Sequence, residues 1–319
     1  MIRVRFWGTR GSLPVALTAA GVRDKVMTAL RGATGRTFAN DRDIADYVDA
    51  LELQVAGTYG GHSACVEIET GAPYHVVCDL GSGVRPFGEA TLAEHGATSP
   101  QTYHIFVSHM HWDHIMGLPF FGPAYIPGNT LHIYGGHATL EEALRRQQSP
   151  PSFPVDFSAF RAKIDFTRLE PGIPHSIAGM TVTLKKQQHG GDSYGYRFDV
   201  DGRTIVYSTD SEHKLADVRE TEGFVEFFRD ADLVVFDAMY SLADAITVKA
   251  DWGHSSNIVG VELCQRAGAK HLCLFHHEPA SDDAAIARVL ADTRRYEEIT
   301  RSGAPLEVTA AYDGMEIDL

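Results

Sequence analysis

The sequence predicts an α/β protein in which two β-sheets pack against each other and helices cover their outer faces. Short apolar, β-rich runs bounded by Gly, Pro or Asp recur along the chain of 319 residues. Helical patterns fall between some of these runs, mainly late in the sequence. Sheets and amphipathic helices must each bury an apolar face, so this order of elements favours packed layers.

The strand-like runs cover 2–7, 64–69, 75–79, 103–107, 131–134, 181–185, 195–199, 204–207, 233–236, 271–275 and 306–309. The clearest helical patterns cover 137–148, 222–229, 256–267 and 282–300, the last after the acidic sequence Ser281-Asp282-Asp283. No linker-like stretch, low-complexity tract or internal repeat divides the chain. We therefore expect one domain over residues 1–319.

Residues 15–57 do not follow the strand-rich pattern and are predicted to form a helical insertion. Asn40 is suited to cap a helix. Apolar residues recur at helical spacing, namely Val22, Val26 and Leu30, then Ile44, Val48 and Leu51. Three roles stay open: a lid over a functional site, a dimer contact, or ordinary packing.

The composition argues against several classes of protein. With 42 acidic and 28 basic residues the net charge is -14, the wrong sign for a general binder of DNA or long RNA. No apolar run approaches the roughly 18 to 20 residues that span a bilayer, and the opening residues lack the apolar region of a secretory signal. We expect a soluble, cytoplasmic protein without a membrane partner. The four scattered cysteines fit buried positions in a reducing compartment.

A dense group of potential metal ligands follows the apolar run 103–107. Its sequence is Ser108-His109-Met110-His111-Trp112-Asp113-His114. Three imidazoles and a carboxylate within six positions, at a strand end, can converge on a small volume, and both groups bind Zn²⁺ and similar ions. The alternative, a polar turn with solvated histidines, gives no reason for this density of ligands. The motif therefore predicts a metal site.

This motif resembles the His-x-His-x-Asp-His sequence of the metallo-β-lactamase superfamily. Later residues match in the expected order: His189 in Gln-Gln-His-Gly, Asp210 in Tyr-Ser-Thr-Asp-Ser, and His276 in Leu-Phe-His-His. The resemblance implies a four-layer αββα sandwich with two divalent metal ions at the edge of the sheets. It assigns His109, His111 and His189 to one ion, assigns Asp113, His114 and His276 to the other, and makes Asp210 the bridge. Zn²⁺ is the expected metal, and Mn²⁺ or Fe²⁺ suits the same ligands.

Three N-terminal motifs are similar to the phosphodiesterase branch of this superfamily, which includes tRNase Z, PhnP-type cyclic phosphodiesterases and cyclic-nucleotide enzymes. They are Phe-Trp-Gly-Thr-Arg-Gly-Ser at 6–12, Tyr-Gly-Gly-His-Ser-Ala-Cys at 59–65 and Cys-Asp-Leu-Gly-Ser-Gly at 78–83. His62 departs from the Asn that is commoner there, and either reaches the site or holds the turn. Asp79 is expected to brace the His109 loop. His277 is expected either to support the ligands from behind or to be structural, since adjacent strand residues face opposite ways and both it and His276 cannot reach one metal.

A further marker of this branch is Trp-Gly-His-Ser-Ser at 252–256. By resemblance, His254 contacts the scissile phosphate and Asp237 orients it, where tRNase Z relatives carry Glu. An imidazole beside the leaving oxygen can donate a proton, and a carboxylate partner raises its basicity. The alternative is that His254 only caps the helix that starts near Ser255. The candidate catalytic residues are therefore Asp113, which is also a ligand, His254 and Asp237.

The expected function is hydrolysis of a small cyclic nucleotide or similar phosphodiester by a hydroxide that bridges the two metals. Acyl hydrolysis of a lactone, β-lactam or thioester is one alternative. A tRNA 3′-processing endonuclease is another, although no insertion dense in Lys and Arg is visible. A purely structural metal site would be closed by four protein ligands. A homodimer is expected because two-fold dimers are the commonest oligomers.

Overall fold

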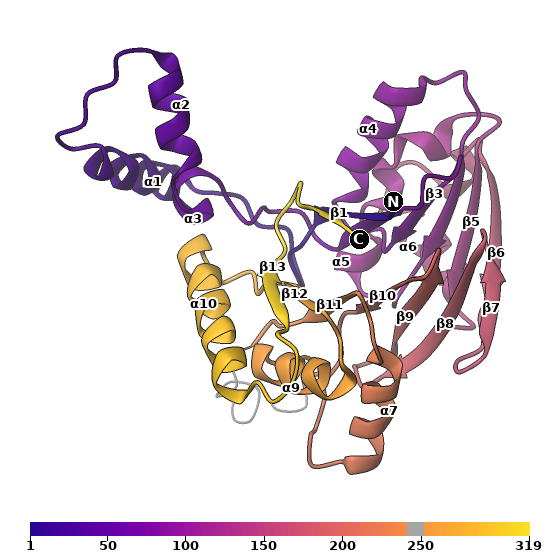
Figure 1. Cartoon of the computed structure of the whole chain (residues 1–319). Helices are drawn as coiled ribbons and strands as arrows, with labels where there is room; N and C mark the ends of the chain where they lie inside the picture. Colours follow the sequence, from indigo (N-terminus) through magenta and orange to yellow (C-terminus); the bar gives the residue numbers. More distant parts are fainter. Residues whose placement is uncertain (241–251) are drawn as a thin grey trace.

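The computed structural model describes residues 1–240 and 252–319 and contains two seven-stranded sheets packed face to face (Figure 1). The order of the first sheet is β14-β1-β2-β3-β4-β5-β6, and that of the second is β13-β12-β11-β10-β9-β8-β7. The first comprises β1 (Arg3–Gly8), β2 (Cys65–Glu69), β3 (His75–Cys78), β4 (Thr102–Phe106), β5 (Thr130–Gly135), β6 (Lys163–Arg168) and β14 (Glu316–Asp318). The second comprises β7 (Pro174–Ile177), β8 (Met180–Gln187), β9 (Ser193–Val200), β10 (Arg203–Ser208), β11 (Leu233–Asp237), β12 (His271–Phe275) and β13 (Glu307–Ala310).

Helices cover the outer face of each sheet, which confirms the predicted αββα sandwich. The first sheet carries α4 (Val84–His95), α6 (Leu140–Gln147) and the short α5 (Trp112–Ile115), with 3-10 turns η1 (Leu118–Phe120), η2 (Gly122–Tyr125) and η3 (Phe157–Ala159). The second carries α7 (Val218–Phe228), α9 (Asn257–Ala267) and α10 (Asp283–Thr300). No helix of the described residues combines the length and the apolar character needed to cross a membrane.

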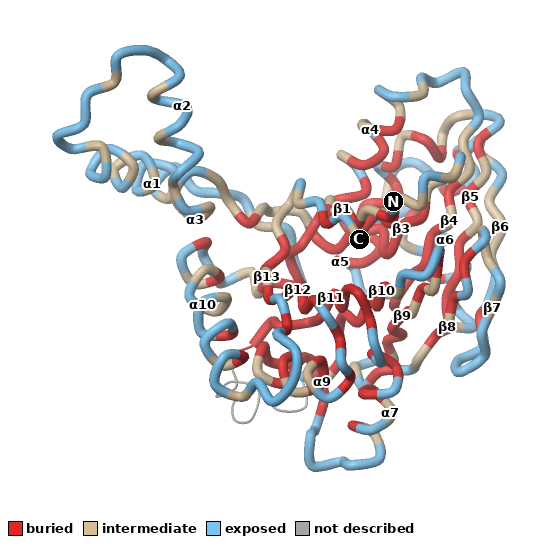
Figure 2. Tube along the Cα trace, viewed as in Figure 1, coloured by how far each residue is buried: buried red, intermediate tan, exposed pale blue. Residues whose placement is uncertain are grey.

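The main core lies between the two sheets, where Figure 2 shows continuous buried chain. Phe6 and Phe106 of the first sheet meet Phe275 and Phe198 of the second, with ring centroids 6.1 and 5.0 Å apart in the pairs Phe6–Phe275 and Phe106–Phe198. Two further apolar clusters lie between each sheet and its helices. Burial of large aromatic side chains is the main favourable term in such a core.

The direction of the strands brings distant residues to one edge of the sandwich. In the second sheet β10, β11 and β12 run parallel, and β8 has the same direction because both β8 and β10 are antiparallel to β9. In the first sheet β3 and β4 are parallel. The carboxyl ends of parallel strands meet at the same edge, so residues just after these strands lie together.

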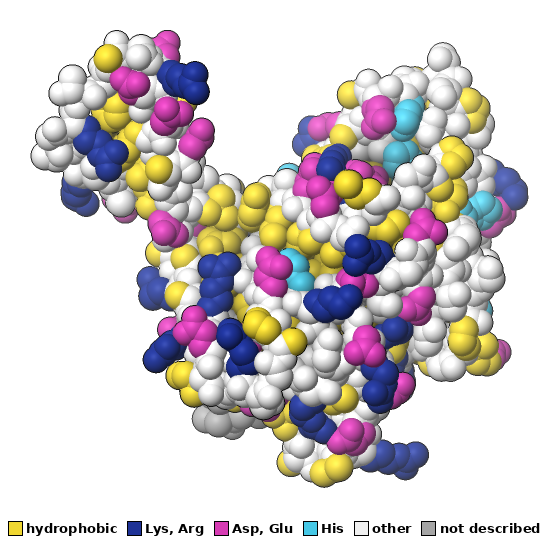
Figure 3. Space-filling view, in the orientation of Figure 1, with side chains coloured by type: hydrophobic (Ala, Val, Ile, Leu, Met, Phe, Trp, Pro, Cys, Tyr) yellow, Lys and Arg dark blue, Asp and Glu magenta, His cyan; other side chains and the backbone are white. Residues whose placement is uncertain are grey.

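The predicted insertion forms helices α1 (Ala19–Gly32), α2 (Asp41–Asp49) and α3 (Leu53–Ala56), and Asn40 caps α2 as expected. Helices α1 and α2 project away from the sandwich and bury none of their residues, whereas Leu53 of α3 packs against the core of the second sheet and its helices (Figures 1 and 2). Figure 3 shows hydrophobic side chains on this arm. Its base is anchored where Lys25 Nζ lies 2.6 Å from Asp283 Oδ2. The expected homodimer stays a prediction.

Candidate metal centre

Seven predicted ligands converge at one edge of the sandwich. Those of the His109–His114 segment follow β4, His189 follows β8, Asp210 follows β10, and His276 follows β12. Asp210 and His276 have φ values of 50° and 61°. This left-handed conformation is uncommon in residues other than Gly, and such conformations cluster at functional sites. Here the left-handed turn occurs just where the chain leaves the sheet.

The first group of donor atoms comes from His109, His111 and His189, whose ligand atoms lie within 4.8 Å of one another. His189 Nε2 lies 3.0 Å from His111 Nδ1. His109 Nε2 and His189 Nε2 each lie 3.7 Å from Asp210 Oδ1. Three imidazole nitrogens and one carboxylate oxygen therefore face a common point.

The second group comes from Asp113, His114 and His276. Asp113 Oδ2, His114 Nε2 and His276 Nε2 are mutually 3.2 Å apart. Asp210 Oδ2 lies 3.1 Å from His114 Nε2 and 3.2 Å from His276 Nε2. The two oxygens of Asp210 thus face different groups, which is the geometry of a carboxylate shared between two cations.

The donor set fits two divalent cations. His109 Nε2 is buried and has no hydrogen-bond partner among the described residues, although it points toward carboxylate oxygen. The other ring nitrogens are fixed from behind: His189 Nδ1 lies 2.8 Å from the Gly253 carbonyl oxygen, and His109 Nδ1 lies 3.1 Å from Ser108 Oγ. Such bonds orient an imidazole toward a metal, and neutral imidazole with carboxylate is an ordinary zinc donor set.

Asp79 anchors this arrangement from the end of β3. It is fully buried and has a φ of 64°. Its carboxylate accepts hydrogen bonds of 2.7 Å from Ser108 N, Ser108 Oγ and Tyr207 Oη, and lies 2.7 Å from His114 Nδ1. Asp79 therefore fixes both the loop and the ring of His114.

The pKa of His114 is shifted in the opposite direction from those of the three histidines in the first group. Burial, with the charge of neighbouring histidines, holds the pKa of His109 well below its usual range, and it also lowers the pKa values of His111 and His189. A lowered pKa favours the neutral imidazole, which is the form that binds metal. Burial disfavours charge on His114 too, but Asp113, Asp210 and Asp79 outweigh it and raise its pKa well above normal. A proton there compensates carboxylates that a divalent cation would otherwise neutralise.

His254 and Asp237 form a pair beside the two groups. His254 Nδ1 lies 2.8 Å from Asp237 Oδ2 and 3.8 Å from Asp210 Oδ1. Asp237 is itself held by the amides of Ser211 and Met239, at 3.3 and 3.1 Å. Burial disfavours charge on His254, but the Asp237 carboxylate outweighs it and raises the pKa of His254 to about 9. His254 does not cap α9, because the Ser256 side chain does so.

Two histidines left open by the sequence have structural roles. His62 Nδ1 lies 3.2 Å from Ser82 Oγ, and its carbonyl oxygen accepts the amides of Thr9 and Arg10, so it holds a turn. His277 is buried, and its Nε2 donates to the Ala311 carbonyl oxygen at 2.8 Å. Of the apolar residues after the motif, Leu118 and Phe121 are core, whereas Phe120 is exposed.

The sequence interpretation missed contacts from the first loop of the chain. The Ser12 amide donates to Asp113 Oδ2 at 2.7 Å. A Cβ atom on Gly11 would lie 2.4 Å from the His276 ring, so only Gly fits there. The motif at 6–12 was a signal for this role, but a contact that spans 101 residues cannot be seen in a linear pattern.

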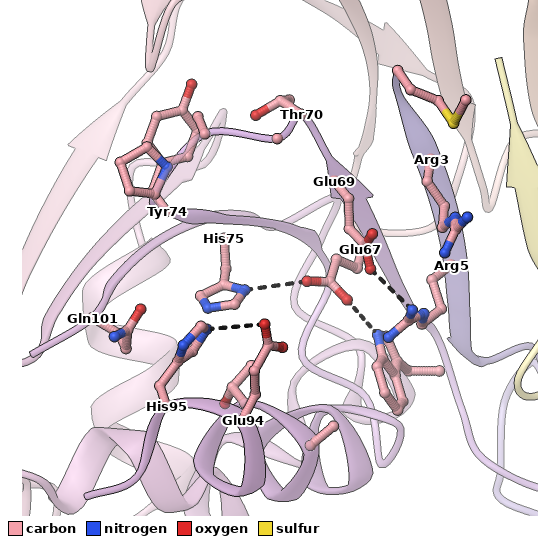
Figure 4. Close-up of a pocket in the computed structure, with 17 residues that line it drawn as sticks. Arg3, Arg5, Glu67, Glu69, Thr70, Tyr74, His75, Glu94, His95 and Gln101 are labelled. Carbon is pink, nitrogen blue, oxygen red and sulfur yellow. Dashed lines mark hydrogen bonds and ion pairs between the residues drawn. The ribbon is translucent and has the colours of Figure 1, made fainter. Parts of the chain in front are cut away.

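A separate cavity of about 670 Å³ lies between α4 and strands β1 to β3 (Figure 4). Trp7 Nε1 donates to Glu67 at 2.9 Å, His75 Nδ1 lies 3.2 Å from the same carboxylate, and Arg5 pairs with Glu69 at 3.2 Å. These side chains pair with one another, although Arg5 Nε has no hydrogen-bond partner among the described residues, and none belongs to the metal groups. The chemistry is therefore assigned to the histidine and aspartate cluster.

Comparison with known proteins agrees with this geometry. Residues 75–277 match the family model described as the beta-lactamase superfamily domain. Ribonuclease Z of Geobacillus kaustophilus is 26% identical over 259 residues, covering 65% of this chain and 81% of that protein. The metallo-beta-lactamase fold protein YhfI of Bacillus subtilis is similar over 99% of this chain and 98% of its own, with a TM-score of 0.64 and 19% identity. A diphosphatase of the PhnP family is similar over 100% of this chain and 98% of its own, with a TM-score of 0.59 and 18% identity. The chain belongs to the metallo-β-lactamase superfamily.

Proposed function

We propose that this protein is a dinuclear metal-dependent phosphodiesterase that cleaves a small cyclic nucleotide or a similar phosphodiester. The observation that carries the proposal is the position of Asp210, whose two oxygens face two separate groups of histidine and carboxylate donors. One group contains His109, His111 and His189, and the other contains Asp113, His114 and His276. Zn²⁺ is the proposed metal, with Mn²⁺ or Fe²⁺ suited to the same ligands.

The chain's own residues supply binding and proton transfer. Bound divalent ions would lower the pKa of water to near neutrality and neutralise charge on phosphate oxygens. Because Asp237 engages Nδ1 of His254, Nε2 is the ring atom left to face a substrate. A protonated His254 can donate its proton to the leaving ester oxygen, and Asp237 keeps the ring oriented and charged. Asp113 accepts a hydrogen bond from the Ser12 amide, and its role in this proposal is that of a metal ligand and not that of the general acid.

The curated relatives named Ribonuclease Z make an RNA substrate the second candidate. Two observations weigh against a long RNA. The net charge is -14. The projecting arm at 15–57 has five Lys and Arg residues against six Asp and Glu residues, so it is not a basic surface for a polyanion. A small phosphodiester carries little charge and needs no such surface.

A substrate panel tests the proposal. Metal-reconstituted protein is incubated with 2′,3′-cyclic AMP, 3′,5′-cyclic AMP, a precursor tRNA with a 3′ trailer, and a lactone. We expect cleavage of at least one cyclic nucleotide, abolished by a chelator and restored by metal. Cleavage of the tRNA alone would assign the protein to 3′ processing, and turnover of the lactone alone would assign it to acyl hydrolysis.

A cytoplasmic location stays a prediction, which the four buried, unpaired cysteines suit.

A further inference from the structure

Two tryptophan side chains next to the metal centre are exposed. Trp112 is 76% exposed and Trp252 is 61% exposed. The third tryptophan of the chain, Trp7, is partly buried and donates to Glu67. Tryptophan is highly buried on average, so two indoles left in water beside one site need a reason. Stacking on a planar ligand is a role that such rings perform.

Both tryptophans are tied to one pair of metal-centre histidines. Trp112 directly follows His111, and Trp252 directly precedes Gly253, whose carbonyl oxygen lies 2.8 Å from His189 Nδ1. His189 Nε2 in turn lies 3.0 Å from His111 Nδ1. Each exposed tryptophan is therefore the chain neighbour of a residue that belongs to, or contacts, one pair of contacting imidazoles.

The turn that carries Trp252 is held firmly. Gly253 has a φ of 82°, and a Cβ atom there would lie 2.4 Å from His189 Nδ1, so the backbone packs directly on the imidazole. The Gly253 amide donates to Glu212 Oε2 at 3.2 Å. The attachment point of the exposed ring is thus fixed relative to the metal centre.

A polar cavity borders the metal centre next to the turn that carries Trp252. A cavity of about 480 Å³ opens there, lined among others by His189, Gly253 and Lys214. Its lining also includes the carboxylates of Glu212, Asp217 and Glu220. Three carboxylates beside one lysine disfavour a long polyanion, whereas hydroxyl groups of a sugar can donate to carboxylates.

We propose that Trp112 and Trp252 stack a nucleobase, so that the substrate is a nucleoside phosphodiester and not a base-free ester. This inference rests on the proposed phosphodiesterase function. Aromatic stacking tolerates any base because every base has a π-face. The site is therefore expected to require a base without discriminating strongly among bases.

The test compares substrates that differ only in the base. Adenosine 2′,3′-cyclic phosphate and ribose 2,3-cyclic phosphate are assayed with wild type, Trp112→Ala, Trp252→Ala and the corresponding Phe and Leu variants. The readout is the ratio of kcat/KM for the base-bearing over the base-free ester. We expect this ratio to fall by about 5- to 100-fold in the Ala and Leu variants and to be largely retained with Phe. Ile299→Ala, an exposed apolar residue on α10, serves as control.

An independent binding measurement separates this inference from the proposed function. Calorimetry compares adenosine 5′-monophosphate with ribose 5-phosphate on the metal-loaded protein. Tighter binding of the nucleotide that depends on both tryptophans supports the stacking site even if no diester is cleaved, in which case only the phosphodiesterase proposal fails. Diester cleavage with equal kcat/KM for both esters, unchanged in the Trp variants, would overturn the stacking proposal and leave the phosphodiesterase intact. Equal affinity for the two monophosphates would overturn it as well.

Discussion

The Nδ1 atom of His254 lies 2.8 Å from Oδ2 of Asp237, and both side chains are buried beside the two groups of metal donors. Asp237 ends β11, and His254 lies just before α9, where an isolated bridge between Tyr240 and Ser256 brings the two segments together. In the proposed mechanism this pair supplies a proton donor that is not itself a metal ligand. The chemistry proposed for the protein depends on this separation of roles.

Replacing Asp237 with Asn tests the positioning of His254. The variant removes the charge that raises the pKa of His254, so kcat is expected to fall by about 10- to 100-fold for diesters with poor leaving groups. Esters of p-nitrophenol need no proton donor and should be affected much less. The matched control is Asp232→Asn. Asp232 lies just before the same strand and pairs with Lys270 and Arg203. Equal losses for both leaving groups would contradict the role.

Metal stoichiometry tests the sharing of Asp210. Wild type is expected to hold two ions per chain after dialysis, measured by inductively coupled plasma mass spectrometry. His189→Ala removes one donor of a single group and should reduce the content toward one. Asp210→Ala removes one oxygen donor from each group and should weaken the binding of both ions. Two tightly bound ions in the Asp210 variant would show that this carboxylate is no bridge.

Gly11→Ala tests the close packing behind His276. The added methyl group would meet the ring at 2.4 Å, so His276 must move, and one ion should bind more weakly. Gly303→Ala is the control, since a Cβ atom there has nothing within 4 Å. Thermal unfolding and metal content are measured on both variants. Unchanged metal affinity in Gly11→Ala would mean that the loop adjusts without displacing the ligand.

The loss of folding stability at acid pH should depend on His213. Its ring lies between those of Phe224 and Phe236, with ring centroids 4.2 and 5.5 Å away. Burial lowers its pKa to about 3. The unfolded chain takes up a proton below roughly pH 6.5 while the folded chain does not, so stability is lost as pH falls from there toward 3. Between pH 7.5 and 5, His213→Phe should lose roughly 2 kcal/mol less unfolding free energy than wild type.

Urea unfolding in the presence of a chelator measures this difference without the effect of pH on metal binding. Identical losses for wild type and His213→Phe over this pH range would contradict the assignment. The hydrogen bond from the His213 amide to Ser255 Oγ, at 3.2 Å, involves only the backbone of residue 213. The substitution should therefore leave that link between β10 and the His254 segment in place.

Much of the sandwich could be predicted because its central strands are continuous apolar runs. The edge strands β6 and β7 and the short β14 were missed, since they are largely exposed or half-buried and mix polar or charged with apolar side chains. Helix α4 was missed because its sequence contains Pro86 and Gly88. Gly88 is needed there, as a Cβ atom would lie 2.9 Å from Phe121.

The clustering of the seven candidate ligands could be predicted because each follows an apolar run and the motif at 108–114 is dense. The pairing of ligands into two groups came from the resemblance to a known superfamily, not from the spacing. The exposure of Trp112 and Trp252 could not be predicted from the sequence, because the solvent exposure of a side chain depends on tertiary structure. The motif at 6–12 was the only signal for the contact from Ser12 to Asp113, whose partner 101 residues away could not be identified from the sequence.

The most direct test of the proposed chemistry is turnover of 2′,3′-cyclic AMP by metal-reconstituted wild type and His254→Ala. We predict that wild type cleaves the diester and that kcat falls by about 10²- to 10⁴-fold in the variant, while both proteins hold two metal ions. Undiminished cleavage by the variant would contradict the role of His254. Hydrolysis of a lactone by both proteins, with no diester cleaved by either, would contradict the phosphodiesterase assignment itself.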